Sequence, residues 1–131
     1  MPIIEIPMAE ESKIAILKSV KKWVKTPGLV DLQVNGFRGV DFNTPGITQE
    51  SLEHSLKAML SSGVTTCLPT IITASETHLQ SCFADLETAR NSSALAKTMI
   101  AGYHLEGPFL STLAGFSGCH PVQEMGAVNP E

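Results

Sequence analysis

Along the middle of the chain, the hydrophobic positions alternate between the spacing of a strand and that of a helix. Residues 28–35 form a short apolar run that stops at Gly36, which predicts a buried strand. A loop with Gly, Asn and Pro over residues 39–47 leads to a stretch that Thr48 can cap as a helix and Gly63 can end. Four apolar residues lie on one face of that helix: Leu52, Leu56, Met59 and Leu60.

A second strand and a second helix follow the same alternation. Residues 64–68 predict the strand, which Pro69 ends. Thr73 and Glu76 form a T-x-x-E capping box at the start of the helix. The apolar stripe of this helix consists of Leu79, Cys82, Phe83, Leu86 and Ala89.

A third strand completes the pattern. Residues 91–93 close the second helix and, after a short linker, residues 98–105 predict a strand that Gly107 and Pro108 stop. The order strand, helix, strand, helix, strand, with connections long enough for right-handed crossovers, predicts an α/β fold with a parallel βαβαβ unit. A closed (β/α)₈ barrel takes about 250 residues and a flavodoxin-like sheet about 130. The strands that would finish either fold do not follow Leu105, so we expect the first part of something larger.

The two ends of the chain have weaker patterns. Residues 3–6 fit a strand, and residues 9–24 fit a helix with an acidic start and a basic end. Residues 14–17 fit another strand equally well, so both alternatives stay open. Residues 111–131 are rich in Gly, Ser and Pro and predict a long loop that a partner or ligand would order.

The composition fits one globular domain. The 131 residues are 43% hydrophobic and 17% charged, which is enough to bury a core. The net charge of −4 comes without a basic stripe, so neither a nucleic acid nor an anionic membrane is an expected partner. The three cysteines have no C-x-x-C spacing, and no signal peptide or membrane-spanning apolar run is evident. These features predict a reducing, cytoplasmic location.

Polar residues follow the predicted strands, where parallel α/β folds gather their reactive groups: Gln33, Asn35, Thr70, His104 and Glu106. Residues 33 and 35 point to the same side of their strand, as do residues 104 and 106. Two interpretations remain open. Glu106 binds a metal ion that offsets the cost of burying a carboxylate. Alternatively, Glu106 caps the following turn and His104 is a hydrogen-bonded core residue, which composition alone favours.

Other motifs are weaker. The H-x-E pattern of residues 104–106 lacks the P-C-x-x-C partner of zinc deaminases. Phosphate-loop, dinucleotide, nucleophile-elbow and H-E-x-x-H motifs are absent from the sequence. Cys119 and His120 are adjacent, and adjacent side chains seldom face each other, so a thiolate nucleophile with a histidine base is disfavoured. His54 and His78 are expected to face solvent on the two helices.

Four linked motifs carry a family resemblance. They are PGLVDLQVNG with GVDFN in residues 27–43, GVTTCLPT with IT in residues 63–73, GYHLEGPFL in residues 102–110, and GCH in residues 118–120. In this order they resemble the N-acetylglucosamine-6-phosphate deacetylases, over most of the chain from Pro27 to about residue 121. That family belongs to the metal-dependent amidohydrolase superfamily, so the resemblance implies the first three strands of a (β/α)₈ TIM-type barrel, incomplete in this chain.

The resemblance also implies a metal site. Glu106 would be the carboxylate ligand of one divalent metal ion, with Zn²⁺ expected and iron or other metals as alternatives. Gln33 and Asn35 take the place of the H-x-H metal pair of many amidohydrolases and, with His104, would lie near the metal. Two amides there imply a single-metal site, because neutral amides are poor Zn²⁺ ligands.

The substrate loop of the family matches Cys119 and His120, so His120 would reach the sugar and Cys119 would act through its backbone. The stretch between Glu106 and His120 is a couple of residues longer than the family pattern. The family's two later histidine ligands and its catalytic aspartate have no counterpart here, so no catalytic residue is assigned. Residues 1–26 would be a shortened N-terminal segment, a remnant of a small β-sandwich or a helix, and residues 27–131 a partial barrel domain.

The function implied for the family is hydrolysis of an acetamido group, which gives acetate and glucosamine 6-phosphate in amino-sugar catabolism. Because Glu106 alone supplies one of about three protein ligands, we expect the isolated chain to be inactive and to bind metal weakly. An alternative is a non-catalytic assembly module that associates with itself through exposed sheet edges. A flavodoxin-like binder of a phosphorylated ligand is a third interpretation, which no glycine-rich phosphate loop supports.

Overall fold

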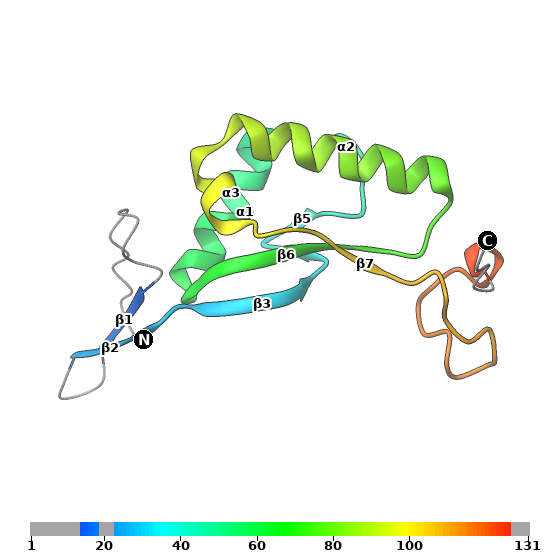
Figure 1. The fold of residues 1–131 in the computed structure, drawn as a ribbon, viewed down its shortest axis with the longest axis horizontal. Helices are drawn as coiled ribbons and strands as arrows, with labels where there is room; N and C mark the ends of the chain where they lie inside the picture. The colour runs from blue at the N-terminus through cyan, green and yellow to red at the C-terminus, as the bar shows by residue number, and fades with distance from the viewer. Residues whose placement is uncertain (1–13, 19–22, 127–131) are drawn as a thin grey trace.

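Three parallel strands form the sheet on which the rest of the chain is arranged (Figure 1). The computed structural model describes residues 14–18 and 23–126. Strand β6 (Val64–Ile72) lies in the centre, flanked by β3 (Leu29–Val34) and β7 (His104–Glu106). Both pairs are parallel, which confirms the predicted α/β class and its βαβαβ order.

Helices α1 (Gln49–Ser61), α2 (Glu76–Ser92) and α3 (Ala94–Met99) gather on one face of this sheet (Figure 1). The core lies between the helices and the strands, because the apolar stripes of α1 and α2 both face inward. Its buried hydrophobic residues are Val34, Phe42, Leu52, Leu56, Met59, Cys67, Ile71, Cys82, Leu86, Ala89, Ala96, Met99 and Ile100.

Helix α1 follows the prediction closely. The Thr48 hydroxyl accepts a hydrogen bond from the Ser51 amide at 3.2 Å, and the Ser51 hydroxyl accepts one from the Thr48 amide at 3.1 Å. This reciprocal pair satisfies amides that the first turn leaves free. At the other end Gly63 has a φ of +93°, a conformation that a residue with a side chain rarely adopts.

The start of helix α2 differs from the prediction. Ser75, not Thr73, is the capping residue, and its hydroxyl accepts from the His78 amide at 3.4 Å. Thr73 is buried instead, and its hydroxyl donates to the backbone oxygen of Glu106 at 3.2 Å. The capping box of Thr73 and Glu76 is therefore wrong, because a tertiary contact takes the hydroxyl that the local pattern assigned to the helix.

Strand β6 continues through Pro69, where the sequence predicted its end. Proline lacks the amide that a central strand donates to its neighbour. Val34, the partner of Pro69 in the register, donates its own amide to the Thr70 side-chain oxygen at 3.0 Å. The register between β3 and β6 shifts just before Val34, so the missing proline donor disturbs the pairing only at this point and both strands continue.

The third predicted strand, residues 98–105, is much shorter in the structure: residues 98 and 99 belong to a helix, and residues 101–103 have no regular structure. Residues 94–99 form α3, which Ser93 caps by accepting from the Ala96 amide at 3.1 Å. Ile100 makes only an isolated parallel bridge to Cys67, and β7 is limited to residues 104–106. Burial of Ala96, together with Met99, against the core outweighs the β-branched residues that suggested a longer strand.

Strand β3 is not the buried strand that the sequence predicted. Leu29, Val30 and Leu32 are 60%, 58% and 65% exposed, and Val34 is its only residue in the core. The reason is position, since β3 is an edge of the sheet and no described element pairs with its free side.

Two further pairs of strands lie outside this unit. Strands β4 (Gly36–Phe37) and β5 (Val40–Asp41) form a small hairpin, and β5 lies where the sequence predicted a loop over residues 39–47. Strands β1 (Ile14–Lys18) and β2 (Trp23–Pro27) pair in antiparallel fashion. The strand alternative is thus right and the helix alternative wrong for that part of the N-terminal segment, while the strand predicted for residues 3–6 lies outside the described residues.

The segment after β7 has little regular structure, as predicted. A single 3₁₀ turn, η1 (Val122–Glu124), is its only such element within the part of the chain that the structure describes. In the same described part, no helix has the length and apolarity to cross a bilayer.

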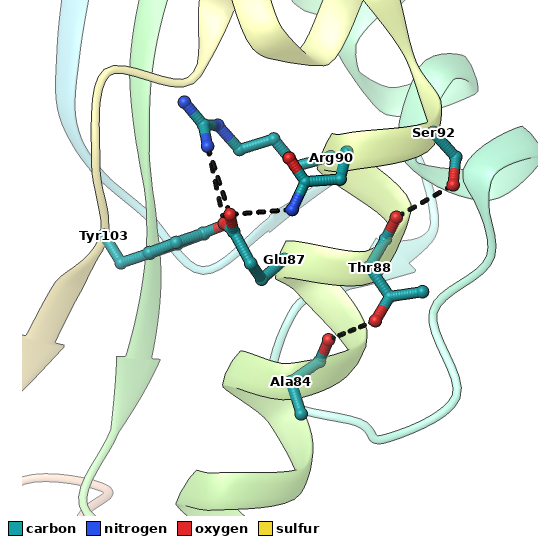
Figure 2. A network of polar contacts seen from close by, with 7 residues as sticks. Ala84, Glu87, Thr88, Arg90, Ser92 and Tyr103 are labelled. Atoms are coloured by element: carbon teal, nitrogen blue, oxygen red, sulfur yellow. Dashed lines mark hydrogen bonds and ion pairs between the residues drawn. The ribbon is translucent and has the colours of Figure 1, made fainter.

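Tyr103, which leads into β7, is fastened to helix α2 (Figure 2). Its hydroxyl donates to the Glu87 carboxylate at 2.6 Å, and Asn91 and Arg90 donate to the same carboxylate at 2.9 and 3.3 Å. The Tyr103 ring meets Phe83 edge to face. The hydrogen bond from Tyr103 is the main cause that lowers the pKa of Glu87, whereas burial and then Glu87 raise the pKa of Tyr103.

This network predicts an acid-sensitive contribution to stability. A lowered pKa means that the contribution is present above the ordinary value of 4.5 and is lost as pH falls through the lower, folded-state value. Tyr103→Phe should therefore reduce the free energy of unfolding at pH 7, and the loss should shrink at pH 3. Thermal unfolding followed by circular dichroism at both pH values measures this difference. An equal loss at pH 7 and pH 3 would contradict it.

Candidate functional site

The carboxyl ends of the three strands bring several of the predicted site residues to one edge of the sheet. Leu105 pairs with Ile71, which is buried beneath the helices. Side chains alternate along a strand, so His104 and Glu106 lie on the opposite face, away from the helices. Glu106 is 31% exposed there.

Strand β3 places its two amides in a similar way. Val34 points into the helix-covered core, so alternation puts Gln33 and Asn35 on the face away from the helices. The Asp31 carboxylate accepts from the backbone nitrogen of Gln33 at 3.1 Å, which fixes the backbone at the irregular point of the strand. Among the described residues, no hydrogen bond joins Gln33 or Asn35 to Glu106. The side-chain nitrogen of Asn35 is buried without a hydrogen-bond partner.

Glu106, His120 and Thr73 form the tightest cluster at this edge. The Nε2 atom of His120 lies 3.4 Å from Oε1 of Glu106, and its Nδ1 atom lies 2.9 Å from the Thr73 hydroxyl oxygen. The His120 side chain is only 8% exposed. The long segment after β7 thus folds back so that an imidazole meets the carboxylate that ends that strand.

His104 has a structural contact. Its Nδ1 atom lies 3.1 Å from the backbone oxygen of Leu32, and a carbonyl can only accept, so the ring donates. Because β7 and β3 flank β6, this hydrogen bond ties the two outer strands across the central one. The hydrogen-bonded interpretation of His104 therefore describes its contact in this structure.

Asn43 is a central residue that the sequence interpretation left in a loop. Its amide nitrogen donates to the backbone oxygens of Asn35 at 3.3 Å and Thr70 at 3.1 Å, and its amide oxygen accepts from the Ile72 nitrogen at 2.7 Å. His78 donates from Nε2 to the Asn43 backbone oxygen at 2.8 Å, so the prediction that His78 faces solvent is wrong. The sequence signal that could have selected Asn43 is its place in the motif of residues 27–43.

The cysteines offer no activated thiolate. Cys67 and Cys82 are buried, and burial raises the pKa of both thiols, that of Cys67 to about 12. The side chain of Cys119 is exposed, whereas the neighbouring His120 is turned inward. The Cys119 thiol therefore faces solvent while the His120 imidazole is buried, although the two residues are adjacent in the sequence.

A metal ion fits this donor set only in part. Glu106 is a suitable carboxylate ligand, and His120 is the imidazole beside it. Within residues 14–18 and 23–126, no group of three or more His, Cys, Asp or Glu side chains could hold a metal ion. A catalytic zinc site takes three protein ligands. The described residues therefore do not complete such a site.

Helices packed on one face of parallel strands, with polar side chains where the strands end, are features of the α/β class and fit part of an α/β-barrel domain. A family model described as "Amidohydrolase family" matches residues 24–125. The chain belongs to the amidohydrolase family, whose members generally bind a divalent metal ion.

Relatives of known name agree with this assignment. The chain is 40% identical over 104 residues to an N-acetylglucosamine-6-phosphate deacetylase of Caenorhabditis elegans, covering 76% of this chain and 24% of that protein. It is 36% identical over 106 residues to the enzyme of the same name from Haemophilus influenzae, covering 81% of this chain and 26% of that protein. The chain thus spans about a quarter of the length of these curated relatives.

A solved structure shows the same fold. The crystal structure of N-acetylglucosamine-6-phosphate deacetylase from Pasteurella multocida aligns with a TM-score of 0.63 and 26% identity, over 91% of this chain and 35% of that chain. The sheet β3-β6-β7 therefore corresponds to the first three strands of a (β/α)₈ barrel, which confirms the fold that the resemblance implied.

Proposed function

We propose that this chain supplies the opening part of a barrel that hydrolyses the acetamido group of N-acetylglucosamine 6-phosphate to give acetate and glucosamine 6-phosphate. The observation that carries the proposal is the meeting of Glu106 and His120, 3.4 Å apart, at the carboxyl end of β7. This edge is where barrels of this class gather their reactive groups. The names of the relatives supply the substrate class.

Each candidate residue has a role in this proposal. Glu106 contributes one carboxylate ligand to a single divalent ion, for which Zn²⁺ is the first candidate. Gln33 and Asn35 line the metal side of the site as neutral amides. His120 contacts the sugar, and Cys119 contributes its backbone. In such hydrolases a bound ion activates water and polarises a carbonyl, and we assign no catalytic acid or base within this chain.

The proposal also covers organisation and setting. Residues 27–131 act as the barrel part and residues 1–26 as a separate N-terminal segment. A cytoplasmic location suits a phosphorylated sugar substrate and three cysteines that are free thiols. The net charge of −4 supports a small-molecule substrate over a nucleic acid or an anionic membrane.

A chimera tests the function directly. In it, residues 27–126 of this chain replace the corresponding segment of the Pasteurella multocida deacetylase. We expect the chimera to release acetate from N-acetylglucosamine 6-phosphate, whereas the purified 131-residue chain with added Zn²⁺ releases none, because it lacks the remaining ligands. Acetate release measures activity, and circular dichroism checks folding. A folded, inactive chimera, or an active isolated chain, would contradict the proposal.

A non-catalytic assembly module is the second candidate, and the exposure of Leu29, Val30 and Leu32 on the edge strand β3 favours it. The same experiment separates the two. A folded chimera without activity, together with a stable metal-free oligomer of the isolated chain in sedimentation equilibrium, would favour self-association through this edge.

A further inference from the structure

Thr73 lies at the junction of the two side chains that the proposed function uses most. It follows the last residue of β6 and is 1% exposed. Its hydroxyl oxygen is 3.2 Å from the Glu106 backbone oxygen and 2.9 Å from Nδ1 of His120. One buried hydroxyl therefore joins the end of β7 to the segment that carries the imidazole.

Both contacts of this hydroxyl are within hydrogen-bond distance, and they reach two different segments of the chain. The Glu106 backbone oxygen can only accept, so the Thr73 hydroxyl is the donor in that contact. The contact with Nδ1 of His120 holds the imidazole ring to the same hydroxyl. Nε2 is the ring nitrogen left to face Oε1 of Glu106, at 3.4 Å.

The backbone around Thr73 is shaped for this contact. A side-chain carbon added at Gly107 would fall 2.0 Å from the Thr73 hydroxyl oxygen, so only glycine allows the two segments to approach this closely. Gly107 also has a φ of +93°. Ile72 precedes Thr73 in the chain, and its backbone nitrogen donates to the side-chain oxygen of Asn43 at 2.7 Å. The backbone next to Thr73 is thus fixed at Ile72, and Gly107 leaves the room that the Thr73 side chain occupies.

We propose that Thr73 is a positioning residue, whose hydroxyl holds the His120 ring at Nδ1 and so turns Nε2 toward Glu106. The role of this positioning in catalysis rests on the proposed function. A substrate bound at that edge would contact an imidazole already oriented beside the carboxylate. A threonine acting only as a helix cap would leave His120 unaffected, and Ser75 already caps α2.

Nuclear magnetic resonance of the full 131-residue chain, with ¹⁵N-labelled histidine, tests the inference without reference to activity. In the unaltered chain, the Thr73 hydroxyl proton should exchange slowly and show a cross-peak to the His120 ring. Thr73→Val keeps the shape but removes the hydroxyl. It should change the ring ¹⁵N signals of His120 and abolish the cross-peaks between His120 and Glu106, and Thr73→Ser should restore both.

The controls separate positioning from folding. The exposed His54 on α1 serves as an internal reference, and its signals should not change in either variant. The Phe83–Tyr103 ring contact reports on whether the fold is intact. Ring signals of His120 that are the same with Val and with Thr would overturn the inference, as would a rapidly exchanging hydroxyl in the unaltered chain. An inactive chimera with an intact Thr73–His120 contact would count against the proposed function alone.

Discussion

Glutamine in place of Glu106 is expected to lower kcat/KM of the chimeric deacetylase at least about 100-fold, because a neutral amide replaces the carboxylate that we propose as a metal ligand. The carboxylate ends β7 and is partly exposed, so the substitution removes charge without opening a cavity. The measurement is acetate release at saturating Zn²⁺, together with the metal content of the purified protein. Both activity and bound metal should fall.

A matched substitution separates this effect from a general loss of charge. Glu124→Gln makes the same chemical change on the 3₁₀ turn η1, in the same segment of chain. It should leave kcat/KM and metal content within about twofold of the unaltered chimera, an effect of a few tenths of a kcal/mol. Equal losses from the two substitutions would refute the role given to Glu106.

Alanine at Gly107 is expected to destabilise the 131-residue chain by about 3 kcal/mol, from a strained backbone and an overpacked contact together. The backbone φ of +93° disfavours any side chain, and the added carbon would lie 2.0 Å from the Thr73 hydroxyl oxygen. Urea unfolding followed by circular dichroism gives the change in free energy.

Gly115→Ala is the control, because it shares the backbone strain without the contact. Gly115 has a φ of +88°, and nothing lies within 4 Å of the position that its added carbon would take. It should cost only about 1 kcal/mol. Similar losses at residues 107 and 115 would mean that the close approach to Thr73 contributes nothing to stability.

Periodicity in the sequence was enough to predict the two long helices and the parallel order of the strands. Most residues of the α1 and α2 stripes are buried as expected, and Leu60, Leu79 and Phe83 pack partly buried against the core, since the spacing of a stripe depends only on the helix itself. The errors arose where a distant partner decides the outcome. Thr73 bonds to Glu106 instead of capping α2, and Val34 uses the Thr70 hydroxyl so that β6 can pass through Pro69.

The candidate site was predictable to a similar degree. The rule that reactive groups follow parallel strands selected Glu106 and His104, and the structure places both at that edge. It could not select Thr73 or Asn43, because their importance comes from contacts across 33 and 27 residues of sequence. Nor could it predict that β3 would be exposed, since burial of an edge strand depends on neighbours that periodicity does not reveal.

The Asn43 side chain has a consequence for how such domains can diverge. One amide satisfies backbone groups from the ends of both β3 and β6, and α2 fastens the same residue through His78. The positions of the strand ends are therefore set before the chain enters the turn over residues 44–47. Residue 43 therefore has little freedom to vary. The turn is constrained as well, because the Gly46 backbone nitrogen donates to the Asp85 carboxylate at 2.7 Å and Ile47 packs against the core.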